Sequence, residues 1–168
     1  MRQRQLVLAL LAGFALSCTQ HEPGHTATGG SPTSGTTEHG SFRPEQVEWK
    51  DGPPSLPAGA KFAVLEGDPA KEGYFAMRAK LPDGYRVPPH WHPGVERVTV
   101  LSGTFHLGMG ETFDATKGEV LPVGTYGTWP AGMKHYVWVE GETVVQFHGE
   151  GPWVIEYLDP NDDPRRKK

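Results

Sequence analysis

The sequence predicts an all-β fold, a β-sandwich or a small barrel, as a single domain over residues 45–160. Glycine and proline recur there roughly every eight to twelve residues, and short runs of alternating apolar and polar side chains lie between them. No segment carries apolar residues at helical spacing over three turns. Short strands joined by frequent turns are typical of a sandwich or barrel.

Each expected strand is bounded by a turn signal, and each should bury alternate side chains. His106 is predicted to point outward, because its neighbours on both sides are apolar. The expected strands are 62–65, 74–81, 95–101, 104–109, 127–129, 135–139, 143–148 and 153–158. The predicted inward set is Val98, Val100, Phe105, Leu107, Met109, Val137 and Val139.

Residues 1–17 have the features of a secretory signal peptide. Arg2 and Arg4 open it, residues 6–16 form an apolar run too short to cross a bilayer comfortably, and a small residue, Ser17, precedes the expected cut. We therefore expect an exported protein.

Cys18 follows the expected cut directly and is the only cysteine, so no internal disulfide can form. A lone cysteine at this place resembles the acylated cysteine of bacterial lipoproteins. That resemblance implies a protein of the bacterial cell envelope, in the periplasm or on the outer membrane, that touches membrane only through an acyl anchor. Secretion with a free thiol at Cys18 is the alternative.

The segments that flank the predicted barrel are polar. Residues 18–44 are rich in Ser, Thr, Gly and Pro and read as a flexible linker, since they bury too little to offset their ordering entropy. Residues 161–168 form a charged tail, predicted to be solvated. The net charge of −4 offers no basic excess for a nucleic-acid partner.

The strongest chemical signal is a set of four candidate metal ligands in two segments. His90 and His92 alternate onto one strand face, and a turn after them brings Glu96 back opposite. A second turn delivers His135 to the start of another strand. Three imidazoles and a carboxylate suit a divalent transition metal, with Mn or Fe favoured and Zn, Ni or Cu as alternatives. Four protein ligands on an octahedral ion leave two positions open, as a catalytic site needs.

These two segments resemble the two motifs of the cupin superfamily, in its small single-domain bacterial form. The first motif has its glycine at Gly84, then His90-x-His92-x-x-x-Glu96 and a closing Gly103; the second has Gly124, Pro130, Gly132 and His135. Val139 stands where many cupins carry Asn. The resemblance implies a cupin jelly-roll β-barrel with the metal in its mouth, bound by His90, His92, Glu96 and His135, and a homodimer.

The alternation along a strand does not decide which way several other polar and aromatic side chains near the predicted mouth point. Gln146 and His148 share one strand face. If their side chains point into the barrel, they are weak candidates for catalysis, and if they point outward, they form a solvated edge. Alternation does not decide the facing of Tyr74, Arg78 and Tyr126. Several aromatic side chains lie on the strand face opposite the ligands, and we expect a second sheet or a second subunit to cover them. These side chains are Trp91, Tyr136 and Trp138.

The function predicted from these features is that of an exported, metal-dependent enzyme with dioxygenase-like or related oxygen chemistry. Its ligand would be a small organic molecule with two oxygen donors, such as a hydroxy acid, a diketone or a catechol. The alternative is a non-catalytic protein of the cell envelope that holds a metal or a small ligand. A purely structural metal is disfavoured by the ligand set, which leaves coordination positions open.

Overall fold

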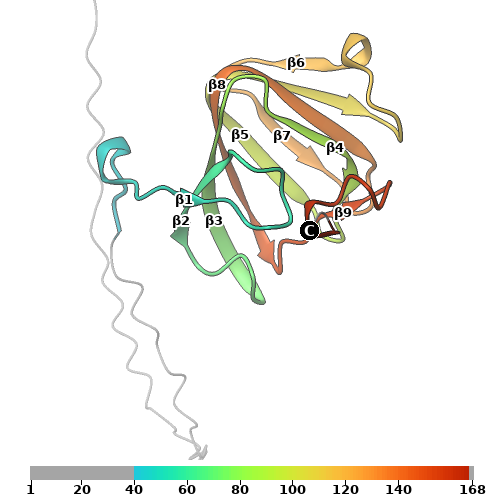
Figure 1. Cartoon of the computed structure of the whole chain (residues 1–168). Helices are drawn as coiled ribbons and strands as arrows, with labels where there is room; N and C mark the ends of the chain where they lie inside the picture. The colour runs from blue at the N-terminus through green and yellow to red at the C-terminus, as the bar shows by residue number, and fades with distance from the viewer. Residues whose placement is uncertain (1–39, 167–168) are drawn as a thin grey trace, which may run out of the picture. The chain divides into compact units, whose positions relative to one another are not determined.

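In the computed structural model, which describes residues 40–166, two long antiparallel strands run side by side as the frame of the fold (Figure 1). They are β5 (Glu96–Met109) and β8 (His135–Gly151), paired from Val98 opposite Phe147 to Met109 opposite His135. The first half of β5 also pairs with β7 and its second half with β6. The first half of β8 pairs with β4 and its second half with β3.

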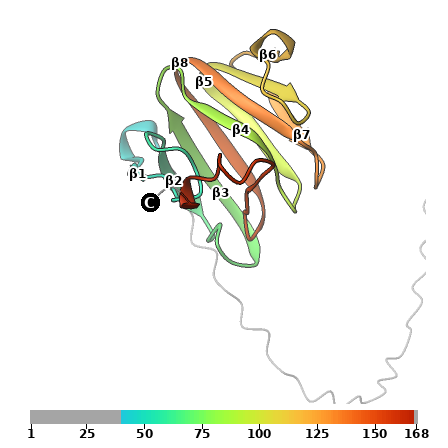
Figure 2. The ribbon, with the colours of Figure 1, turned by 45° about the vertical axis from the view of Figure 1, so that its right-hand side comes forward.

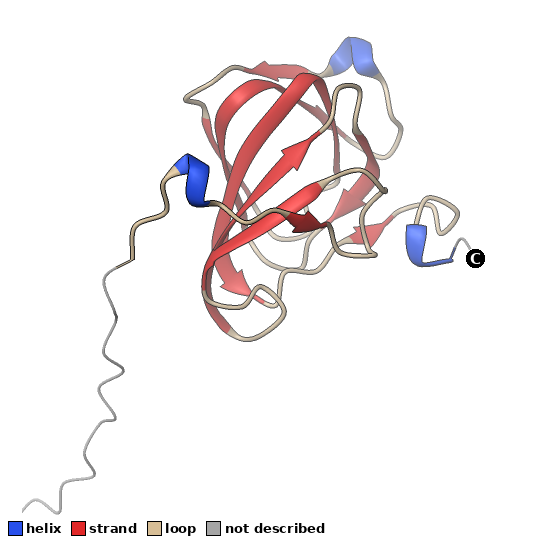
Figure 3. Cartoon of the chain, turned by 60° about the vertical axis from the view of Figure 1, so that its left-hand side comes forward, coloured by secondary structure: helices blue, strands red, loops and turns tan. Residues whose placement is uncertain are grey.

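The nine strands of residues 40–166 form one sheet, every pairing is antiparallel, and the sheet curls into a barrel (Figures 2 and 3). The predicted all-β barrel is therefore confirmed. The other strands are β1 (Lys50–Asp51), β2 (Lys61–Glu66), β3 (Gly73–Leu81), β4 (Arg86–Trp91), β6 (Glu119–Leu121), β7 (Tyr126–Trp129) and β9 (Glu156–Tyr157). Three short 3-10 helices are η1 (Pro44–Gln46), η2 (Ala115–Lys117) and η3 (Pro164–Arg166).

Glycines bend the two long strands where the sequence predicted that they would end. Strands were expected to end on either side of Gly103, but β5 continues through it with a φ of +77°, and β8 likewise continues through Gly141 at +70°. A Cβ on Gly103 would lie 2.3 Å from the Thr143 hydroxyl oxygen. The predicted pairs of strands, 95–101 with 104–109 and 135–139 with 143–148, are each one bent strand, so a single pair of strands serves both halves of the barrel.

The core confirms the predicted alternation almost everywhere. Apart from Met109, every member of the predicted inward set is buried. Met109 is 56% exposed, because it lies at the end of β5 beyond the last layer of the core. Phe62 of β2 and Phe147 of β8 stack with ring centroids 6.5 Å apart, which joins the inner faces of two strands.

The segment after β9 folds back onto the barrel. Asp163 is buried, and the Nε atom of Arg165 donates a hydrogen bond to its carboxylate at 2.7 Å. Nη2 of Arg165 also donates to the Ile155 carbonyl at 3.3 Å. Residues 163–165 thus differ from the solvated tail that was expected.

The predicted signal peptide 1–17, Cys18 and most of the linker 18–44 lie outside the described residues. Between residues 40 and 166, no helix has the length and apolar character needed to cross a membrane.

Candidate metal centre

Three histidines meet inside one end of the barrel. His90 lies near the end of β4 and pairs in register with His135, the first residue of β8, while His92 follows β4 directly. All three are buried, and one ring nitrogen from each lies within 4.8 Å of the others. The centroids of the His90 and His135 rings are 4.2 Å apart.

Each of these imidazoles is oriented by a main-chain carbonyl. The Nδ1–H groups donate to the carbonyls of Pro88, Val154 and Met133, from His90 at 2.7 Å, His92 at 2.6 Å and His135 at 3.0 Å. A hydrogen bond at Nδ1 fixes the tautomer that leaves the Nε2 lone pair free. The Nε2 atoms of His92 and His135 are buried and make no hydrogen bond. Buried nitrogens without a hydrogen-bond partner fit a metal ion as the missing partner.

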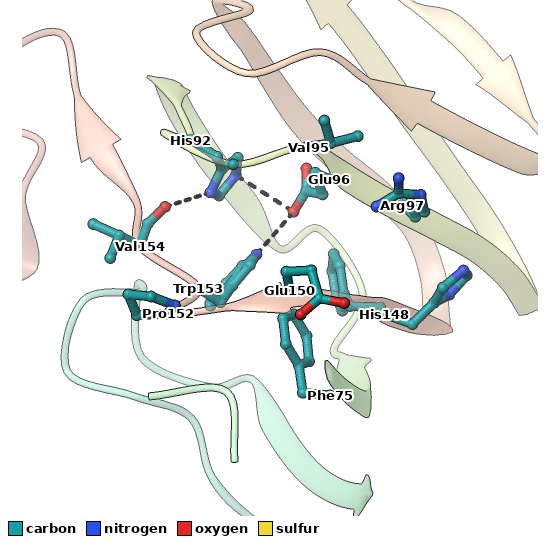
Figure 4. A pocket seen from close by; sticks show the side chains of 12 residues that line it. Phe75, His92, Val95, Glu96, Arg97, His148, Glu150, Pro152, Trp153 and Val154 are labelled. Carbon is teal, nitrogen blue, oxygen red and sulfur yellow. Dashed lines mark hydrogen bonds and ion pairs between the residues drawn. The ribbon is translucent and has the colours of Figure 1, made fainter. Parts of the chain in front are cut away.

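Glu96, the first residue of β5, adds a buried carboxylate to the three rings. Its Oε1 lies 3.4 Å from Nε2 of His92, and its Oε2 lies 3.4 Å from Nε2 of His135. The indole Nε1 of Trp153 donates to Oε1 at 3.4 Å (Figure 4). The structure therefore brings together all four residues that the sequence selected.

Burial sets the charges in this cluster. Desolvation, reinforced by His135 and His92, lowers the pKa of His90 to about 3. Desolvation also lowers the pKa of His92, against the opposing charge of Glu96. Burial raises the pKa of Glu96, but the neighbouring histidines outweigh this effect and lower the pKa to about 2. At neutral pH His90 and His92 are thus neutral donors beside an ionised carboxylate, which is the state that binds a cation.

The space next to the four residues is apolar. The cavity measures about 30 Å³, room for an ion and very little solvent. Its wall is made by aliphatic and aromatic side chains from several strands, among them Leu81, Tyr85, Val87, Phe105, Val137 and Ile155. One polar centre in an apolar cavity is the usual character of a small-ligand site.

Residues 37–154, more than half of the chain, match the family described as the ChrR cupin-like domain. The chain belongs to this cupin family. A search of curated proteins finds no match.

Solved structures with the same fold share little sequence with this cupin. The polyketide cyclase RemF from Streptomyces resistomycificus is 17% identical, with a TM-score of 0.59 over 76% of this chain and 90% of its own. An acetylacetone dioxygenase from Acinetobacter johnsonii is 16% identical, with a TM-score of 0.56 over 87% and 88%. An RmlC-like cupin from Shewanella frigidimarina NCIMB 400 is 20% identical, with a TM-score of 0.52 over 68% and 91%. At these identities the likeness shows the fold.

Gln146 and His148 lie on the outer face of the cupin barrel. Between them in sequence, Phe147 fills the core, so the alternating residues point away from the histidine cluster. Gln146 accepts a hydrogen bond from Nε of Arg78 at 3.1 Å, and His148 stacks on Tyr126 with centroids 5.9 Å apart. These contacts correspond to the outward of the two alternatives left open by the sequence.

Two of the outer aromatic side chains, Tyr136 and Trp138, are covered by the same chain, whereas Trp91 is half-buried. His106 points outward as predicted but is buried, stacked on Trp138 at 4.7 Å. The hydroxyl of Tyr136 donates to the Asp114 carbonyl at 2.9 Å, and Phe113 packs against both aromatic rings. The loop that contains η2 thus covers Tyr136 and Trp138, where a second sheet or a second subunit was expected to do so. A homodimer stays a prediction that rests on the cupin resemblance.

Sequence reasoning missed Trp153 as part of the site. Its ring stacks on His92 at 5.3 Å, and it lies in the loop after β8 rather than on the strand expected at 153–158. The three carbonyls that orient the histidines were missed as well. Main-chain partners have no residue-type signal, and a loop side chain follows no alternation, so neither could be found from the pattern.

Proposed function

We propose that this cupin binds one divalent transition metal through His90, His92, Glu96 and His135, and that it is a metal-dependent enzyme acting on a small organic molecule. The observation that carries the proposal is the convergence of three carbonyl-oriented imidazoles on an ionised, buried carboxylate. Mixed nitrogen and oxygen donors favour Mn or Fe, with Zn, Ni or Cu as alternatives.

Some residues of the site would bind the metal, and others exclude water from it. The histidines would supply neutral nitrogen donors, and Glu96 would partly neutralise the cation. Trp153 and the apolar cavity wall keep bulk solvent from the polar centre. A redox-active metal held there would supply Lewis acidity and the capacity to react with O2. That two neighbours of this fold are a dioxygenase and a cyclase supports an enzyme, although the fold alone hosts many activities.

Metal content measured by elemental analysis tests the centre. The wild-type protein should hold one ion per chain, and His90→Ala, His92→Ala, His135→Ala and Glu96→Gln should each lose it. The loss in affinity should exceed the roughly 10–100-fold typical of residues that only support a ligand. His106→Ala, a buried histidine on the outer face, is the matched control and should keep the ion. Full occupancy in His135→Ala would contradict the proposal.

Turnover separates an enzyme from a metal-holding protein. The Mn- or Fe-loaded protein should consume O2 in the presence of diketones, hydroxy acids or catechols, and Glu96→Gln should abolish the consumption. A fully loaded protein that turns over no member of these classes would favour the non-catalytic alternative.

A further inference from the structure

A second pocket, drawn in Figure 4, lies next to the histidine cavity. His92, Glu96, Phe147 and Trp153 line both spaces, so the second pocket borders the candidate centre. Its polar lining adds Arg97, His148 and Glu150, none of which borders the inner cavity.

Arg97 lines this pocket close to Gly149 of β8. A Cβ built on Gly149 would lie 3.7 Å from Nη1 of Arg97 and 3.9 Å from Cε1 of Phe75. Both are ordinary van der Waals distances, so the guanidinium lies over Gly149 without taking the place of a side chain there. Arg97 directly follows Glu96 in the chain, which ties the position of its backbone to that of the proposed ligand.

The guanidinium of Arg97 has no protein partner among the described residues. Two other arginines there are hydrogen-bonded to side chains: Arg78 to Gln146, and Arg165 to Asp163. Glu150 lines the same pocket, but it is exposed and is not within 4.0 Å of Arg97. Arg97 itself is half-buried. A guanidinium carries five donors in a planar fork that matches a carboxylate, so an unpaired one at a pocket is suited to bind that group.

We propose that Arg97 binds a carboxylate of the molecule on which this cupin acts. The ligand is then a small organic acid, with a keto or hydroxyl oxygen that reaches toward the histidines. This inference rests on the proposed function and narrows it, because it selects keto and hydroxy acids over neutral diketones and catechols.

A matched pair of ligands tests the proposal. Acetoacetate and acetylacetone share one skeleton, in which a carboxylate replaces one acetyl group. Calorimetric titration of the metal-free protein isolates the contribution of Arg97, because no cation is present to attract the anion. Wild-type protein should bind acetoacetate at least about tenfold more tightly, the usual gain from a charge-assisted hydrogen bond. Arg97→Gln should abolish the preference and Arg97→Lys should retain part of it.

Arg78→Gln is the matched control, since it removes the same charge from the outer face of the barrel and should leave the preference intact. Equal affinity of wild-type protein for the two compounds, or no binding of acetoacetate, overturns the proposal whether or not the variants fold. So does a preference that survives Arg97→Gln or disappears in Arg78→Gln. The proposed function fails separately: wild-type protein that holds no metal yet prefers acetoacetate would refute the metal centre and leave the acid site standing.

Discussion

The imidazole of His92 has neighbours at both nitrogens and on one face, although only Nδ1 makes a hydrogen bond. Nδ1 donates to the Val154 carbonyl at 2.6 Å, Trp153 stacks on the ring, and Glu96 lies beside Nε2. Two of these three supports come from one short loop between β8 and β9. Orientation of a ligand by its surroundings is what raises metal affinity beyond that of a free imidazole.

Trp153→Phe removes the indole donor to Glu96 and retains an aromatic ring. We expect metal affinity to fall about tenfold, the lower end for a supporting residue, since the bond measures 3.4 Å. Competition with a fluorescent chelator measures the change. Trp138→Phe, on the outer face, should leave affinity unaltered; an equal loss in both variants would point to general loosening of the fold.

Acid should destabilise the metal-free protein. The folded-state pKa of His90 is lowered to about 3. Between about pH 3 and about pH 6.5, His90 is therefore protonated in the unfolded chain but not in the folded chain. Stability is therefore full above pH 6.5 and falls as the pH drops, by up to about 1.4 kcal/mol per pH unit for each such histidine.

The carboxylate of Glu96 also makes the folded state less stable as the pH falls, but at lower pH than His90. The lowered pKa of Glu96 means that its contribution is present above about pH 4.5 and is lost as the pH falls toward 2. Urea denaturation of chelator-treated protein from pH 8 to pH 4 measures the slope. A stability independent of pH between 7 and 5 would show that these histidines are not buried as neutral groups.

The bent strands are the elements that place the ligands. Glu96 and His135 are the first residues of β5 and β8, and because these strands are antiparallel, Met109 rather than Glu96 pairs with His135. The curl of the sheet, and not the register of this pair, therefore brings the carboxylate to the rings. The bends at Gly103 and Gly141 let one pair of strands contribute to both halves of the barrel. Both glycines adopt positive φ, but only Gly103 lies against neighbouring atoms.

Gly103→Ala and Gly141→Ala separate backbone strain from packing. Alanine at Gly141 meets no atom within 4 Å and should cost about 1 kcal/mol, from the left-handed backbone alone. Alanine at Gly103 adds a clash with Thr143 and should cost about 3 kcal/mol. Urea midpoints at constant m-value measure the difference. Equal costs would mean that the corner relaxes freely around the added methyl group.

For the whole molecule, export stays a prediction. Cutting after Ser17 should expose Cys18 and allow its acylation, which mass spectrometry of the N-terminal peptide from membrane-extracted protein would detect as added acyl mass. Cys18→Ser should release the protein from the membrane fraction. A bare thiol on soluble protein would refute the anchor while leaving secretion intact.

The amino-acid sequence alone predicts the fold class, the inward face of most strands, and the four residues that meet in the barrel. It could do so because alternation along a strand is local, and because His90, His92, Glu96 and His135 lie beside turns that the sequence marks with glycine and proline.

The surroundings of that cluster follow from the packing of the folded chain and not from any local pattern. The outward placement of Gln146 and His148 depends on Phe147 filling the core, and the cover over Trp138 depends on the path of the loop around η2. Trp153 stacks on His92 from a loop, and Arg97 lines the neighbouring pocket close to Gly149. Such contacts join residues far apart in the chain, and packing selects them without any periodic signal in the sequence.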